Sequence, residues 1–240
     1  MRVAVCISGQ ARSLTENYEN ILTNLVAPNN ADVFVHTWYD PSEVGQRFCG
    51  KKEKEKNFIN KTTLEENTPE LIEKYFKPKG FLHQKQIQFV DNEVLDMSPS
   101  DPKNPYYNKW YIRPQFCLSM FWSIMKCNEL KNDYEKEKDF TYDAVIRTRF
   151  DLRMTREYKM SQFDLNFIHA NGHSHASYAK QDVFAFSNSS NMDCYSNVFS
   201  GIPFMMSQGV EFCPELLLGA HLWMSKKEVS SFPGGYSIVR

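Results

Sequence analysis

A ten-residue stretch organises this chain: Tyr142-Asp143-Ala144-Val145-Ile146-Arg147-Thr148-Arg149-Phe150-Asp151. Its apolar part, Ala144-Val145-Ile146, is rich in β-branched residues and predicts a buried strand. Arg147, Arg149 and Asp151 follow at a spacing of two, which directs the side chains of an extended chain to one face. Because ligands in open α/β sheets bind at the carboxyl ends of the strands, this charged end is the first candidate site.

Two interpretations of this charged end fit the sequence. Two guanidinium groups grip a polyanion bidentately, and an adjacent carboxylate holds a divalent cation that neutralises phosphates. Arg147, Arg149 and Asp151 therefore suit a nucleotide-diphosphate site. In the simpler interpretation, Asp151 forms a salt bridge with one of the arginines at the end of the strand.

The two strands expected nearest the N-terminus also finish in polar residues. Val3 to Ile7 predicts a strand, and a short Gly-containing turn leads from it into a helix from about Thr15 to Val26. Asp32 to Trp38 predicts the second strand. We expect the tips of these strands to hold a nucleotide through Ser8, Gly9, Gln10, Arg12, His36 and Thr37. The alternatives are that the turn is only structural and that His36 is a hydrogen-bonded structural residue.

A long helix predicted from about residue 114 to 137 leads into the strand of the opening stretch. Its apolar residues recur at helical spacing, as Phe116, Met120, Ile124, Cys127 and Leu130 do. A crossover helix of this kind delivers the following strand parallel to the earlier ones. The sequence therefore predicts a single α/β domain over residues 1–240, with a mixed, mainly parallel, Rossmann-type sheet flanked by helices.

The remaining elements are predicted from shorter patterns. A polar insert or mobile loop is expected at 41–68. Helices are expected at Thr68–Phe76, at Asn191–Phe199 and from Pro214 to about Met224. Strands are expected at Ile87–Val90, Asn166–Ala170, Asp182–Ser187 and Tyr236–Arg240.

Composition excludes several classes of protein. The chain of 240 residues has 28 basic and 29 acidic residues, so no general attraction to nucleic acid is expected. Its six cysteines form no Cys-x-x-Cys motif, which argues against a zinc knuckle. No apolar run approaches the roughly 18 residues of a spanning helix, and the first apolar run is too short for a signal peptide. We expect a soluble cytoplasmic protein whose oligomeric state the sequence does not reveal.

Several segments together resemble a group of proteins of bacteria, algae and large algal viruses that are taken to be glycosyltransferases. The likeness spans nearly the whole chain in order. It is carried by Val3 to Arg12, Asp32 to Trp38, Ser119 to Ile124, Tyr142 to Asp151, Asp182 to Ala185, Pro214 to Leu217 and Tyr236 to Arg240. Such proteins are similar to the GT-A class of nucleotide-sugar transferases. The resemblance implies a sugar moved from a nucleotide-sugar donor to a glycan or other hydroxyl acceptor.

In the GT-A class, an Asp-x-Asp motif after a central strand binds manganese or magnesium and the donor diphosphate. Arg149-Phe150-Asp151 stands in its place, so the resemblance implies Mn²⁺ or Mg²⁺ at Asp151 alone. Arg149 offers another way to neutralise the phosphates, and metal dependence stays open. An inverting transferase also needs a carboxylate that accepts the proton of the acceptor hydroxyl. Asp182 is the first candidate for this base and Glu215 the second.

Two other classes of function compete with this hypothesis. A module that binds a nucleotide sugar or a carbohydrate without catalysis would use the same strand tips. Nucleotidyltransferases and sulfotransferases usually carry a phosphate-cradling loop or several acidic metal ligands, and neither is clear in this sequence.

Overall fold

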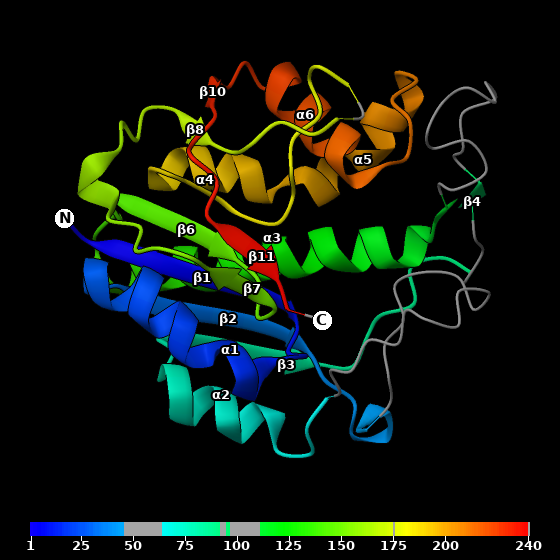
Figure 1. Ribbon diagram of the computed structural model, residues 1–240. Helices are drawn as coiled ribbons and strands as arrows, with labels where there is room; N and C mark the ends of the chain where they lie inside the picture. The colour runs from blue at the N-terminus through cyan, green and yellow to red at the C-terminus, as the bar shows by residue number, and fades with distance from the viewer. Residues whose placement is uncertain (46–63, 92–94, 97–110, 175, 240) are drawn as a thin grey trace.

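The computed structural model describes residues 1–45, 64–91, 95–96, 111–174 and 176–239 (Figure 1). Its centre is a seven-stranded sheet with the strand order β10-β8-β9-β6-β1-β2-β3. The four strands β6, β1, β2 and β3 are parallel, β9 runs antiparallel to both β6 and β8, and β10 is parallel to β8. Their bounds are β1 Val3–Gln10, β2 Asp32–Trp38, β3 Gly80–Gln84, β6 Ala144–Thr148, β8 Ile168–His169, β9 Ala185–Ser187 and β10 Val229–Ser230.

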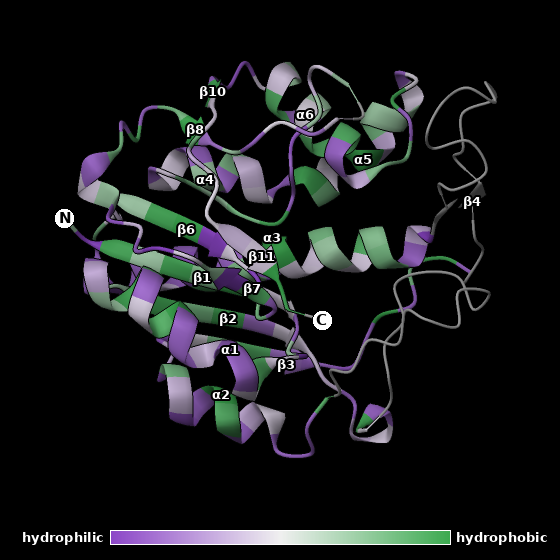
Figure 2. Ribbon diagram, viewed as in Figure 1, coloured by the Kyte–Doolittle hydropathy of each residue, from purple (hydrophilic) through white to green (hydrophobic). Residues whose placement is uncertain are grey.

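Helices cover both faces of this sheet. α1 (Leu14–Ile21) and α2 (Thr68–Phe76) cover one face, and the other carries α3 (Pro114–Lys138), α4 (Ser189–Ser196), α5 (Val198–Ser207) and α6 (Pro214–Met224). Alternate residues of β1 supply the two cores: Val5 packs toward α1 and α2, and Cys6 packs toward α3. In Figure 2 the central strands are mainly apolar.

Smaller elements complete the described chain. α1 continues as a π-helical segment, Leu22–Val26, and a 3₁₀ turn, Ala27–Asn29; further 3₁₀ turns lie at Pro41–Glu43 and Met160–Gln162. β7 (Leu152–Met154) pairs antiparallel with β11 (Tyr236–Ile238), which places the C-terminal segment against the chain that follows β6. β4 (Leu95–Asp96) pairs with β5 (Tyr111–Ile112).

The predicted α/β class with a mainly parallel sheet flanked by helices is confirmed. The strand at Asp32–Trp38 and the helix at Thr68–Phe76 have the predicted bounds, and α3 delivers β6 parallel to β1. Of the polar insert expected at 41–68, residues 46–63 lie outside the described residues. Across the described ranges, no helix has both the length and the apolar character that a membrane crossing requires.

The strand predicted at Ile87–Val90 is wrong, because the edge strand is β3, at Gly80–Gln84. The side chain of Gln115 takes the place of a strand partner for residues 87–90. Its Nε2 donates to the carbonyl oxygen of Ile87 over 2.6 Å, and its Oε1 accepts from the backbone N–H of Phe89 over 2.8 Å. An extended apolar segment is thus satisfied without joining a sheet.

Other predicted bounds also need correction. The helix expected at Asn191–Phe199 is two helices, α4 and α5, which meet at Asn197. The strands expected at Asn166–Ala170, Asp182–Ser187 and Tyr236–Arg240 are shortened to β8, β9 and β11. Asp182 therefore precedes its strand instead of beginning it.

Candidate functional site

The carboxyl ends of β1, β2 and β6 lie side by side at one edge of the sheet. Ser8 of β1 is level with His36 of β2, and Cys6 of β1 is level with Arg147 of β6. Three segments that are far apart in the sequence therefore end together, as expected for parallel strands. The predicted site residues of the first half of the chain meet those of the second half at this edge.

The charged residues after β6 form a bidentate salt bridge. Arg149 donates from Nε to Asp151 Oδ1 over 2.8 Å and from Nη2 to Oδ2 over 2.7 Å. Nε of Arg12, in the turn after β1, lies 3.4 Å from the same Oδ2. The Asp151 side chain is 5% exposed, whereas those of Arg149 and Arg12 are 22% and 24% exposed. The simpler interpretation of the spacing, a salt bridge at the strand end, is confirmed, and Arg12 extends it to β1.

The backbone around Asp151 is held from two directions. β6 ends at Thr148 and the chain turns at Phe150 and Asp151, so these residues do not continue the extended strand. Buried Asn17 of α1 donates from Nδ2 to the carbonyl oxygens of Phe150 and Leu152 over 2.8 and 2.9 Å. Val239, beside β11, donates its N–H to the carbonyl oxygen of Asp151 over 2.8 Å. The position of the carboxylate is therefore fixed by α1 and by the C-terminal segment.

Arg147 is only 2% exposed and interacts electrostatically with the partly exposed Arg149. Its Nη1 donates to the backbone carbonyl oxygen of Asp182, and its buried Nε has no hydrogen-bond partner among the residues that the structure describes. Among the described residues, no carboxylate forms a salt bridge with it. Burial lowers the pKa of Arg147, which Tyr195 and the carboxylates of Asp182 and Asp151 partly offset. A guanidinium buried with an unused donor is costly unless a partner arrives.

The two candidate bases, Asp182 and Glu215, interact electrostatically near Arg147. Burial, followed by the negative charge of Glu215, raises the pKa of Asp182, and the charges of Arg147 and Arg149 oppose this rise. Asp182 is half-buried. Glu215 is engaged by its neighbours, since Oε2 accepts from the Cys213 thiol over 3.0 Å and Oε1 lies 3.8 Å from Nε2 of His173. The raised pKa gives Asp182 a greater tendency to take up a proton than an ordinary aspartate has.

The tip of β1 leaves room beside its backbone. Gly9 has a φ of 117°, a conformation that residues with a side chain rarely adopt, and no atom lies within 4 Å of where its Cβ would be. The hydroxyl of Ser8, and that of Thr148 at the end of β6, are buried without hydrogen-bond partners. Gln10 completes β1 and is half-buried. These features suit the close approach of a ligand to the backbone.

His36 and Thr37 are packed inside the molecule instead of facing an opening. The His36 ring is fully buried, with Nδ1 2.7 Å from the hydroxyl of Ser123 on α3. Burial lowers the pKa of His36 to about 4. Thr37 is fully buried and donates weakly to the carbonyl oxygen of Trp38 over 3.4 Å. The structural alternative given for His36 describes this placement, and a ligand role for either residue stays a prediction.

A divalent cation at Asp151 does not fit the arrangement of side chains. Both carboxylate oxygens accept from Arg149, and Arg12 adds a second positive charge, so a cation bound there would meet two guanidinium groups. The described residues also contain no group of three or more His, Cys, Asp or Glu side chains that could hold a metal ion. We therefore derive no step through a metal.

Sequence reasoning missed two residues that shape this site. Asn17 is a polar residue on the buried side of α1, and only the tertiary structure shows that it binds the turn around Asp151. Tyr195 of α4 is buried with an unpartnered hydroxyl and interacts electrostatically with Arg147 and Asp182. The one signal for Asn17 was an amide at the helical spacing of Leu14 and Ile21, which are both buried.

Comparison with known proteins adds no identification. No protein-family model matches the chain, and no curated protein sequence matches it either.

Proposed function

We propose that this protein is a glycosyltransferase that moves a sugar from a nucleotide-sugar donor to a glycan or other hydroxyl acceptor. The observation that carries the proposal is the buried guanidinium of Arg147, which has an unpartnered Nε and no salt bridge among the described residues. It lies near the carboxyl end of β6 and interacts electrostatically with the partly exposed Arg149, which shares Asp151 with Arg12. In this proposal, a diphosphate at this edge of the sheet binds these guanidiniums.

The donor is proposed to lie across the tips of β1 and β6. The open space beside Gly9 lets a diphosphate approach the backbone, and the unpartnered hydroxyl of Ser8 supplies a further polar group. Gln10 and Arg12 follow on the same turn. This arrangement agrees with the GT-A class that the sequence resembles, in which the donor diphosphate binds after a central strand.

The reaction is a displacement at the anomeric carbon. A bond forms between the acceptor oxygen and that carbon, and the bond to the diphosphate oxygen breaks. The electron pair leaves with the nucleoside diphosphate, whose growing negative charge Arg147 and Arg149 stabilise. In an inverting displacement, Asp182 accepts the proton of the acceptor hydroxyl, a role that its raised pKa favours. Glu215 is the second candidate for this base.

In this proposal, positive side chains neutralise the diphosphate in place of a metal ion. The sequence-based prediction of Mn²⁺ or Mg²⁺ at Asp151 stays a prediction. A cation bound there would have to displace Arg149 from Asp151. The cytoplasm, where nucleotide sugars are substrates for soluble enzymes, is the compartment that we propose.

A thermal-shift screen tests the proposal directly. UDP-, GDP-, CMP- and dTDP-sugars would each be added with and without manganese, because a ligand that binds the folded state raises its melting temperature. We expect one donor class to stabilise the protein without manganese. Incubation with that donor should then release the nucleoside diphosphate slowly by hydrolysis.

The outcomes separate the competing functions. Stabilisation by a nucleotide sugar without any hydrolysis or transfer would favour a non-catalytic binding module. Stabilisation that requires manganese would support the metal site that the sequence predicts at Asp151. If none of the four donor classes shifts the melting temperature, the glycosyltransferase proposal is wrong.

A further inference from the structure

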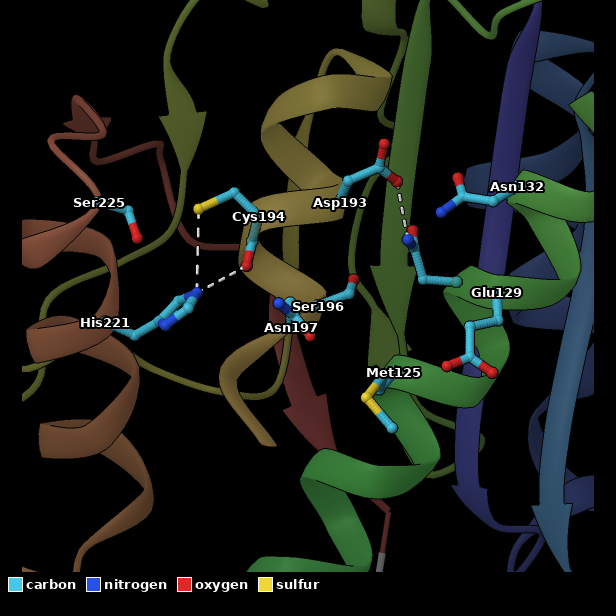
Figure 3. Close-up of a pocket in the computed structure, with 10 residues that line it drawn as sticks. Met125, Glu129, Asn132, Asp193, Cys194, Ser196, Asn197, His221 and Ser225 are labelled. Carbon is cyan, nitrogen blue, oxygen red and sulfur yellow. Dashed lines mark hydrogen bonds between the residues drawn. The ribbon is translucent and has the colours of Figure 1, made fainter. Parts of the chain in front are cut away.

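A polar pocket lies on the helical side of the molecule, away from the carboxyl edge of the sheet. It has a volume of about 450 Å³ and opens between α3, α4 and the C-terminal end of α6 (Figure 3). From Glu215, beside the candidate base, to Ser225, in the pocket wall, α6 rises about 15 Å. Nothing in the proposed transfer uses this pocket.

One buried side chain of the pocket wall has an unmet hydrogen bond. Asn128 of α3 is 5% exposed and lines the pocket. Its Nδ2 donates to Oδ1 of Asp193 over 2.8 Å, whereas its buried Oδ1 has no hydrogen-bond partner in the described parts of the chain. An amide oxygen held in this way favours a ligand that donates a hydrogen bond.

The two carboxylates of the pocket wall already have lysine partners. Oδ1 of Asp193 also accepts from Nζ of Lys131 over 2.9 Å, and Glu129 accepts from Nζ of Lys126 over 2.6 Å. His221 lies close to Cys194, with Nε2 2.9 Å from its carbonyl oxygen, and burial lowers the pKa of the imidazole, so the ring is neutral at pH 7. Lys131 is shared with Glu135, but neither pocket carboxylate is left without a lysine contact, so neither is an open site for a cation.

The wall instead presents uncharged groups that both donate and accept. Asn132 and Asn197 contribute amides, Ser196 and Ser225 contribute hydroxyls, and Met125 adds an apolar surface. Amide groups and hydroxyls pair with ligand groups that donate and accept at the same atom, as the hydroxyls of a sugar do. The volume falls within the range of about 300 to 1,000 Å³ that small-molecule sites occupy.

We infer that the pocket between α3, α4 and α6 binds a neutral sugar unit, with a sugar hydroxyl donating to Oδ1 of Asn128. This site is separate from the proposed nucleotide-sugar site at the tips of β1 and β6. The inference does not rest on the proposed transfer. Within that proposal, it would hold a distant unit of a glycan acceptor.

The test is binding of uncharged sugars to the full chain, measured by saturation-transfer NMR and titration calorimetry. Glucose, galactose, mannose and xylose would be compared with disaccharides of the same sugars, which distinguishes a free monosaccharide site from a glycan site. We expect saturable binding of at least one sugar. Asn128→Leu should weaken it at least tenfold, because the buried acceptor is lost.

A second variant guards against a folding defect. Asn132→Ala removes a half-buried amide whose side chain makes no hydrogen bond with the described residues, so the fold should be unaffected while sugar binding weakens several-fold. Asn166→Ala, which removes an exposed amide outside the pocket, is the matched control and should bind as the wild type does.

Three results would overturn the inference. These are the absence of saturable binding for every sugar, binding that neither pocket variant weakens, and a pocket that takes inorganic phosphate or an alkylammonium ion in preference to a sugar. Because nucleotide-sugar binding is measured separately by thermal shift, failure of this site would leave the proposed function standing, and the reverse also holds.

Discussion

Two buried basic side chains, Lys131 and Arg147, differ in how many of their N–H donors are hydrogen-bonded. Lys131 of α3 is fully buried, and its Nζ donates to Glu135 over 2.9 Å, to Asp193 over 2.9 Å and to the hydroxyl of Ser189. An ammonium has three donors, and all three are used. Arg147 of β6 is just as buried, yet it donates to one backbone carbonyl and leaves Nε unpartnered.

The contrast distinguishes Lys131, whose charge joins two helices, from Arg147, which we propose binds a ligand. Lys131 joins α3 to α4, since Glu135 also accepts from the hydroxyl of Ser189 and from the backbone N–H of Tyr142. Each of the three donors of the Lys131 ammonium is satisfied in that network, as a stable interior requires. Arg147 breaks this rule at the edge of a parallel sheet, and such departures are expected at functional sites. The following variants test whether the contrast is real.

The largest effect is expected for Lys131→Met. Removing the ammonium leaves the carboxylates of Glu135 and Asp193 without their cation, and breaking a buried ion pair typically destabilises a protein by about 3–5 kcal/mol. We expect a fall of this size in the free energy of unfolding, measured by urea denaturation at pH 7. Lys136→Met, which replaces an exposed lysine on the same helix, should change it by less than about 0.5 kcal/mol. Equal effects of the two variants would contradict a structural role for the buried network.

His36 is a third buried basic side chain, and unlike Lys131 and Arg147 it stays neutral. Its pKa is lowered to about 4 by burial, from the ordinary value of 6.5. The folded state therefore resists protonation, so stability is full above pH 6.5 and is lost progressively as the pH falls toward 4. The full loss, reached below pH 4, is about 3.5 kcal/mol, because the pKa falls from 6.5 to about 4 and a change of one in the pKa corresponds to about 1.4 kcal/mol.

The measurement is urea denaturation of wild type and His36→Gln between pH 7 and pH 4. Glutamine does not titrate, so the advantage of the wild type over the variant should shrink as the pH falls. A constant difference across this range would show that His36 does not titrate with folding.

For Arg147→Met we expect a loss of ligand binding with little loss of stability. Methionine fills much of the space of the arginine stem and removes a buried charge without a salt bridge, so the free energy of unfolding should stay within about 1 kcal/mol of wild type or rise. Affinity for the nucleotide sugar found by the thermal-shift screen should fall about 100-fold, or about 2.7 kcal/mol. Calorimetry would measure it.

Arg156→Met provides the matched control, since Arg156 is exposed and donates to the carbonyl oxygen of Pro233, in the loop before β11. It should bind the donor as the wild type does. If Arg147→Met destabilised the protein as strongly as Lys131→Met, the two cations would be alike and the contrast would fail.

The sequence predicted the elements of the sheet better than the contacts of the site. Strands β1, β2 and β6 are continuous apolar runs, and parallel topology follows from the crossover helix. The stripe predicted for α3 is wrong at Phe116, which is exposed. The edge segment at residues 87–90 has the same apolar pattern but binds the Gln115 side chain, a contact that no local pattern encodes. Short strands such as β7 and β10 depend on distant partners and were not predicted.

At the site, the sequence predicted which residues gather but not how they pair. The spacing of Arg147, Arg149 and Asp151 fits both a ligand seat and a salt bridge, and the structure places Arg149 on Asp151 while Arg147 has no salt bridge among the described residues. This division depends on the turn at Phe150, which Asn17 holds from α1. An interaction between α1 and the chain after β6 spans more than a hundred residues, so spacing within one strand cannot reveal it.

The smallest effect on stability is expected for Asp182→Asn, and its sign is opposite to that of Lys131→Met. The pKa of Asp182 is raised by burial and by Glu215, so the folded state favours the protonated form. Its contribution to stability is present below the ordinary pKa of an aspartate and is lost as the pH rises through the raised value. Asparagine does not ionise, so the variant should be slightly more stable than wild type at pH 7, and this gain should vanish in acid.

Transfer activity provides the second readout for Asp182→Asn. If Asp182 accepts the proton of the acceptor hydroxyl, the variant should lose transfer while its affinity for the donor stays unchanged, because Arg147 and Arg149 remain in place. In the wild type, kcat should rise with pH along a limb whose midpoint lies above the ordinary pKa of an aspartate. Glu215→Gln is the matched variant, since its carboxylate is held by Cys213 and His173. Loss of transfer in Glu215→Gln with activity kept in Asp182→Asn would assign the base to Glu215. Removal of the charge at Asp182 would then change the chemistry and leave the fold intact, whereas removal of the charge at Lys131 would destabilise the fold.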